Sequence, residues 1–144
     1  MKPEARQYEQ TAIEVVQSNL PPPVVTFTGP GNVWRLEQDY GYQDGANLIT
    51  VPAGFQFDLA SIPRIFWGLI APFELSIVAP LLHDFLYKNG GNPAAGTIEP
   101  PRVYTRNEAD QLFRRVMEIE GVPAWRRHPA YYAVRAFGGR AWHG

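Results

Sequence analysis

The segment Leu81-Leu82-His83-Asp84-Phe85-Leu86-Tyr87 decides how this sequence is interpreted, because it places a histidine, a carboxylate and a phenol in an otherwise apolar run. A run of this kind predicts a buried helix, and ionisable side chains are rarely buried in a core unless they have partners. The nearest polar side chains that could pair with them lie on a second predicted helix, which begins around Asn107-Glu108-Ala109-Asp110. We therefore expect the two helices to pack together with their polar groups in contact.

The composition predicts one folded domain. The chain has 144 residues, of which 45% are hydrophobic and 13% aromatic, and this is enough to bury a core. The absence of cysteine excludes disulfides, thiolate nucleophiles and Cys-ligated metals. A formal net charge of −1 offers no field that would attract nucleic acid, so no nucleic-acid partner is expected.

No segment is typical of a signal peptide or a transmembrane span. The run Met1–Arg6 lacks the apolar stretch of a signal peptide. The longest apolar candidate for a span is interrupted by Pro63, Arg64, Pro72, Glu74 and Pro80. We therefore expect a soluble protein.

The first 23 residues are predicted to form a helical arm and a stiff spacer. Residues 4–18 have a helix-compatible composition, and Pro21-Pro22-Pro23 is typical of an extended spacer. The arm either packs on its own domain or reaches a neighbouring subunit. The expected organisation is therefore an arm and spacer at residues 1–23 and a single α+β domain at residues 24–144.

Strands precede helices in this domain, and that order is typical of the α+β class. A small antiparallel sheet or meander is expected from strands at residues 24–28, 33–37, 48–52 and 55–58, with turns at 29–32 and 44–45. Helices are expected from residue 76 or 79 to 87, from 105 to 121, and from 129 to 137. The second helix has a capping box of Thr105 and Glu108, and a loop at residues 92–102 precedes it.

The helical period separates the roles of His83 and Asp84. His83 and Tyr87 lie one turn apart on the same face, whereas Asp84 is rotated by about 100°. Asp84 therefore points to a different surface. If the second helix packs antiparallel to the first, Asp110 approaches the His83 ring and Phe113 fills the space beside it.

A histidine oriented by a carboxylate is the arrangement of a general base. In this interpretation His83 is the base, Asp110 orients it and Tyr87 orients the carboxylate. The same contacts equally describe a closed structural network that joins the two helices to the turn at residues 61–64. Catalysis requires a solvent-reached pocket at His83, and the sequence leaves both interpretations open.

The spacing His83-Asp84-x-x-Tyr87 followed by Asp110-x-x-Phe113 resembles the helix pair of the secreted phospholipases A₂. The resemblance covers about two helices. It implies that His83 activates water, that Asp84 binds calcium and that Asp110 orients His83. Tyr87 and Phe113 would be supporting residues.

Asp58 is a second predicted cation ligand, since Ca²⁺ and Mg²⁺ bind several carboxylate oxygens. It lies in the block Asp58-x-x-Ser61-x-x-Arg64, and Ser61 and Arg64 are expected to support the site. Asp58 could instead cap the turn through a backbone amide or pair with Arg64. Zinc is less suited, because His83 is the one well-placed histidine.

A second resemblance covers most of the chain from Val51 to Trp142. Four blocks occur in order: Gly54-Phe55-x-x-Asp58-x-Ala60-Ser61-Ile62-Pro63, Leu82-His83-Asp84-x-Leu86-Tyr87, Ala109-Asp110-x-x-Phe113 and Val134-x-x-Phe137-Gly138-Gly139. This succession is similar to a family of small proteins of tailed bacteriophages and prophages that is classed as a domain of unknown function. The resemblance implies a phage protein located in the virion or the host cytoplasm.

Two hypotheses follow. The first is a metal-assisted hydrolase of a lipid or a cell-envelope ester or amide, in which His83 and Asp110 activate water and Asp84, with Asp58, holds Ca²⁺ or Mg²⁺. The second is a non-enzymatic component of the virion tail, neck or baseplate, in which the network is structural. Its contacts with other phage proteins would come from the N-terminal arm and from an arginine-rich tail, which contains Arg126, Arg127, Arg135 and Arg140 and no acid.

Overall fold

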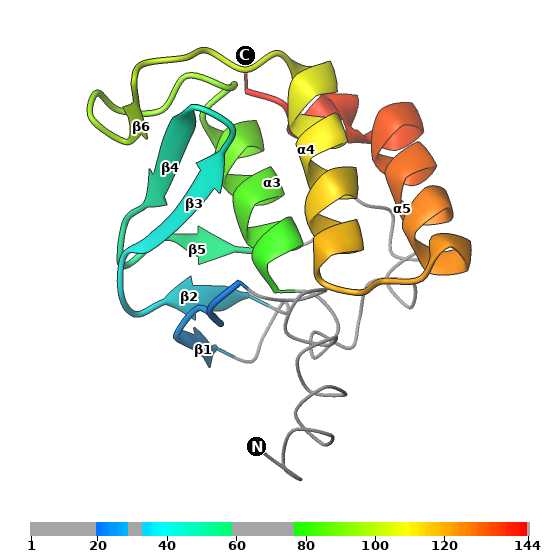
Figure 1. Cartoon of the computed structure of the whole chain (residues 1–144), viewed down its shortest axis with the longest axis horizontal. Coiled ribbons are helices and arrows are strands. Elements are labelled where there is room, and N and C mark those ends of the chain that lie inside the picture. The colour runs from blue at the N-terminus through cyan, green and yellow to red at the C-terminus, as the bar shows by residue number, and fades with distance from the viewer. Residues whose placement is uncertain (1–19, 29–32, 59–76, 144) are drawn as a thin grey trace, which may run out of the picture.

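The computed structural model describes residues 20–28, 33–58 and 77–143. Within these ranges, two small antiparallel sheets, formed by the first half of the chain and the short strand β6 (Ile98–Glu99), pack beside three helices from the second half (Figure 1). The predicted α+β class is therefore confirmed. The predicted helix at residues 4–18 and the turns at 29–32 and 61–64 lie outside the described residues.

The first sheet has the order β1-β2-β5 and is antiparallel throughout. Its strands are β1 (Val25–Phe27), β2 (Trp34–Leu36) and β5 (Gln56–Phe57). Alternation in β2 buries Leu36 completely while Arg35 faces solvent. The three predicted strands in these regions are confirmed, and they are shorter than the sequence pattern indicated.

The second sheet has the order β3-β4-β6, and the sequence predicted only its central strand. A hairpin joins β3 (Tyr40–Asp44) to β4 (Asn47–Val51), and Gly45 adopts φ +60° in its turn. The third strand, β6 (Ile98–Glu99), lies in the segment predicted to be a loop. It forms only by pairing with Leu48 and Ile49, so no local pattern reveals it.

The helices are α3 (Val78–Lys88), α4 (Arg106–Ile119) and α5 (Ala124–Phe137), followed by the 3₁₀ turn η3 (Gly138–Ala141). The capping box at Thr105 and Glu108 is confirmed. The predicted start of the last helix at Pro129 is wrong, since α5 begins after Pro123 and continues through Pro129. A proline in the second turn removes one N–H donor, and here the helix tolerates that loss.

The central helix is α3, which lies between the two sheets and α4 (Figure 1). Every residue from Val78 to Tyr87 is buried, so this helix presents almost no polar face to solvent. His83 and Asp84 must therefore be satisfied by protein groups. No helix among the described residues is long and apolar enough to cross a membrane.

Candidate active site

The predicted contact between His83 and Asp110 is present. Nε2 of His83 lies 2.7 Å from Oδ1 of Asp110, and the two residues are 2% and 0% exposed. The contact forms because α3 and α4 are antiparallel: Ala79 is hydrogen-bonded to Glu120 at one end, and Tyr87 to Arg106 at the other. The packing of two helices thus joins residues that lie 27 positions apart.

Asp110 of α4 accepts hydrogen bonds from three side chains, two on α3 and one on α5. Tyr87 Oη donates to the same Oδ1 at 2.7 Å, and Arg135 Nη1 of α5 donates to Oδ2 at 2.7 Å. Burial by itself raises the pKa of Asp110, but the hydrogen bonds from His83, Tyr87 and Arg135 outweigh burial and lower the pKa below its usual value. Asp110 is therefore an ionised carboxylate in the core.

His83 is a neutral imidazole at pH 7. Burial lowers its pKa, and the opposing influence of Asp110 does not reverse this shift. Because an ionised carboxylate only accepts hydrogen bonds, Nε2 carries the proton and donates a hydrogen bond to Asp110, which makes Nδ1 the basic ring atom. The ring packs between Tyr87 and Phe113, with centroid distances of 4.1 and 4.5 Å. The predicted place of Phe113 beside the ring is therefore correct.

Two arginines, neither of which the sequence analysis assigned to this site, complete the network. Arg106 Nε donates to Tyr87 Oη at 3.0 Å, and its Nη2 donates to the carbonyls of Val134 and Arg135. Burial and the contact with Asp110 raise the pKa of Tyr87, so it remains a phenol. The four-residue spacing of Arg106 and Asp110 on α4 is a local signal that could have identified Arg106. Arg135 has no such signal, because the basic tail contains four similar arginines.

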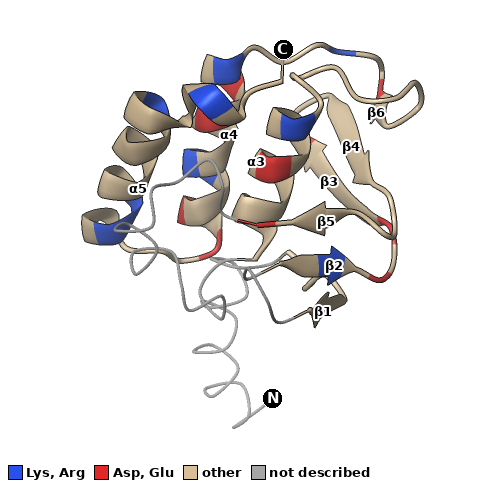
Figure 2. Cartoon of the chain, turned by 180° about the vertical axis from the view of Figure 1, so that it is seen from behind, with Lys and Arg blue, Asp and Glu red and all other residues tan. Residues whose placement is uncertain are grey.

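Asp84 faces away from His83, as the helical period predicts. Its Oδ2 accepts a hydrogen bond from the Asp58 amide at 3.1 Å and lies 3.3 Å from Lys88 Nζ. The one acidic and the one basic position of α3 are adjacent in Figure 2. Burial raises the pKa of Asp84 to about 7; the nearby Asp58 charge also raises it, and Lys88 lowers it. Asp84 is therefore a buried carboxyl group with an ammonium partner.

The described residues do not fit a divalent cation at Asp84 and Asp58. Among them, no group of three or more His, Cys, Asp or Glu side chains could hold a metal ion. Ca²⁺ takes six to eight oxygen ligands and Mg²⁺ six, and the Asp84 oxygen is already paired with Lys88. Ser61 and Arg64, the predicted supporting residues, lie outside the described ranges.

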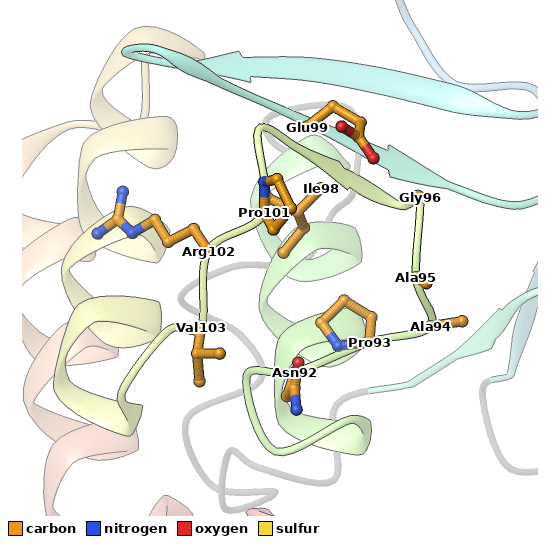
Figure 3. A pocket seen from close by; sticks show the side chains of 10 residues that line it. All are labelled: Asn92, Pro93, Ala94, Ala95, Gly96, Ile98, Glu99, Pro101, Arg102 and Val103. Atoms are coloured by element: carbon orange, nitrogen blue, oxygen red, sulfur yellow. The ribbon is translucent and has the colours of Figure 1, made fainter.

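Two pockets lined by described residues lie away from the pair of His83 and Asp110. The larger, about 580 Å³, is open to solvent and is lined by the loop from Asn92 to Val103 (Figure 3). The smaller, about 220 Å³, lies between residues 21–24 and 38–41. Neither is lined by His83, so these pockets do not supply the solvent access that catalysis at His83 requires.

Comparison with known proteins places the chain in a family without naming an activity. Over 112 residues, the chain is 30% identical to "Uncharacterized protein y4jT" of Sinorhizobium fredii. The match covers 76% of this chain but only 30% of that longer protein. No solved structure matches the chain. Residues 34–134, which include α3, α4 and most of α5, match the family described as "Protein of unknown function (DUF1353)", so the chain belongs to the DUF1353 family.

Proposed function

We propose that this DUF1353 protein is a hydrolase in which His83 and Asp110 form a general-base dyad. One observation carries the proposal: Nε2 of His83 lies 2.7 Å from a fully buried carboxylate. Such a carboxylate fixes the imidazole tautomer and stabilises the imidazolium that forms when the base takes a proton.

The reaction uses the neutral form of His83. Nδ1 takes a proton from a water molecule while the water oxygen bonds to an ester or amide carbonyl carbon. The imidazolium then returns a proton to the leaving oxygen or nitrogen as its bond to that carbon breaks. Because burial lowers the pKa of His83, the ring is an unprotonated base at neutral pH.

The proposed substrate is a lipid or a cell-envelope ester or amide, and the proposed setting is a tailed bacteriophage or prophage. The setting is supported by the four sequence blocks that occur in the order of the phage family. The substrate class is supported by the pairing of Asp110 with both His83 and Tyr87, which follows the phospholipase A₂-like helix pair.

The proposed hydrolysis does not use a metal cation at Asp84, because the Asp84 carboxyl group is paired with Lys88 and the Asp58 amide. Ca²⁺ or Mg²⁺ at Asp84 and Asp58 is tested directly by titration calorimetry of the wild-type protein and Asp84→Asn. We expect the wild-type protein and Asp84→Asn to give the same heat when Ca²⁺ or Mg²⁺ is added. A heat that this variant abolishes would establish the cation site.

Hydrolysis is tested with p-nitrophenyl butyrate and with vesicles of phosphatidylglycerol and phosphatidylcholine. His83→Gln is expected to lower kcat/KM by about 100-fold or more, as loss of a general base does. His128→Gln is the matched control, because His128 is exposed on α5. The proposal fails if the wild-type protein hydrolyses neither probe, or if folded His83→Gln retains full activity.

A non-enzymatic virion component is the second candidate, and the 2% exposure of His83 favours it. In this function the dyad and its two arginines serve only to join α3, α4 and α5. The N-terminal arm and the basic tail would contact other phage proteins. Mass spectrometry of purified particles should then find the protein at a fixed copy number; its absence from particles would contradict this candidate.

A further inference from the structure

We propose that Arg135 is a positioning residue of the His83–Asp110 dyad, so that α5 is part of the site. This inference rests on the proposed function. It concerns a residue that acts through Asp110, since the guanidinium contacts the carboxylate and not the His83 ring.

The two oxygens of Asp110 have different partners. Arg135 holds Oδ2, while His83 and Tyr87 share Oδ1, and each of the three distances is 2.7 Å. A carboxylate anchored on one oxygen has a fixed rotation about its Cβ–Cγ bond. The contact with Arg135 thus directs Oδ1 toward Nε2 of His83, which sets the orientation of the ring.

Arg135 is itself held in place by Arg106. The Arg106 side chain donates to the Arg135 carbonyl at 2.8 Å and to the Val134 carbonyl at 2.7 Å. Its Nε donates to Tyr87 Oη, the group that donates to Asp110. Arg106 and Arg135 therefore link α3, α4 and α5 through a ring of hydrogen bonds that includes the Asp110 carboxylate.

The charge of Arg135 also keeps the buried carboxylate ionised. An unpaired charge in a core is strongly unfavourable, and a cation in hydrogen-bond contact removes most of that cost. The other described polar side chains close to the pair are Tyr87 on α3 and Arg106 on α4, with Tyr131 on α5 near Arg135. Of the two cations, only Arg135 contacts Asp110 directly.

The test follows the Nε2 proton of His83 by ¹H NMR. A proton shared with a carboxylate at 2.7 Å resonates far downfield, and its loss in His83→Gln assigns it. Arg135→Gln should move this resonance upfield by a resolved amount, and Arg135→Lys should move it less. Arg140→Gln removes the same charge from an exposed position on η3 and should leave the resonance unchanged.

A purely structural arginine would lower the melting temperature without moving the resonance of the folded variant. An unchanged resonance in folded Arg135→Gln therefore overturns the proposal. If Arg135→Gln does not fold, Arg135→Lys decides, because the lysine ammonium group keeps the charge but not the planar geometry of the guanidinium contact. An unchanged resonance in folded Arg135→Lys is then the contradicting result.

Kinetics separate this inference from the proposed function. With p-nitrophenyl butyrate, Arg135→Gln should lower kcat about tenfold with little change in KM, and Arg135→Lys should recover part of that loss. If the wild-type protein is inactive, the hydrolase proposal fails, while the resonance still tests whether Arg135 positions the dyad. If the protein is active and the resonance does not move, only the role of Arg135 is contradicted.

Discussion

At Asp84, burial changes the charge that a carboxyl group carries in the folded protein. The residue is 4% exposed, and its pKa rises from 3.8 to about 7. Between these two pH values the folded protein holds a proton at Asp84 that the unfolded chain releases. The stability that Asp84 contributes is therefore complete below pH 3.8 and is lost as the pH rises toward 7.

Asp84→Asn should stabilise the protein at high pH, because it removes the cost of ionising a buried group. We expect a gain in unfolding free energy on the order of 2 kcal/mol at pH 8 and a smaller gain at pH 5. Urea unfolding at the two pH values measures the difference. A variant less stable than wild type at pH 8 would show that the Lys88 ion pair outweighs burial.

Gly91 is required by the close approach of two backbone segments after α3. It has φ +77°, and a Cβ at this position would lie 1.8 Å from the carbonyl oxygen of Tyr104. Gly91→Ala should therefore cost more than about 2 kcal/mol of unfolding free energy. The matched control is Gly96→Ala at φ +91°, where nothing lies within 4 Å, and it should cost only about 1 kcal/mol. Equal costs in thermal unfolding would contradict this account.

Among the helices, α3 takes its N-terminal cap from a neighbouring helix. Its own cap residue, Ile77, has no side-chain acceptor, and the carboxylate of Glu120 accepts from the amides of Val78 and Ala79 at 3.4 and 3.1 Å. Glu120 lies at the end of α4, so the antiparallel packing that joins His83 to Asp110 also satisfies the start of α3.

Glu120→Ala should lower the unfolding free energy by about 1 kcal/mol, the usual value of a helix cap. Glu120→Gln retains an acceptor oxygen and should recover most of the loss, apart from the attraction between the negative charge and the helix dipole. Urea unfolding of both variants provides the measurement. The cap has no energetic role if Glu120→Ala is as stable as wild type.

The prediction of elements succeeded where the signal is local. The capping box at Thr105 and Glu108 closes within one turn, so its residues alone specify the start of α4. At Pro129 the local rule was misleading, because proline favours a helix start but does not require one. The strand β6 has two residues and depends wholly on its partner β4.

For the whole molecule, Asp110 is the point at which three helices are joined. Asp110→Ala leaves His83, Tyr87 and Arg135 without their shared acceptor and should cost about 3–5 kcal/mol. The double variant with His83→Ala should cost less than the sum of the two single variants, by about 1 kcal/mol or more. Urea unfolding of the four proteins completes the cycle, and strict additivity would refute the coupling.

The sequence by itself determined the α+β class and the presence of three helices in the second half, because the order of strands and helices and the helical period are local signals. It also named Asp110 as the partner of His83, on the condition that the two helices pack antiparallel, because a buried polar group needs a partner. The tertiary structure alone decided the division into two sheets, the cap from Glu120 and the contact of Arg135 with Asp110. These contacts join residues 25 to 42 positions apart, and no local pattern distinguishes Arg135 from the other arginines of the tail. Which arginine reaches the carboxylate depends on how α5 packs against α4, and that packing is a property of the whole core.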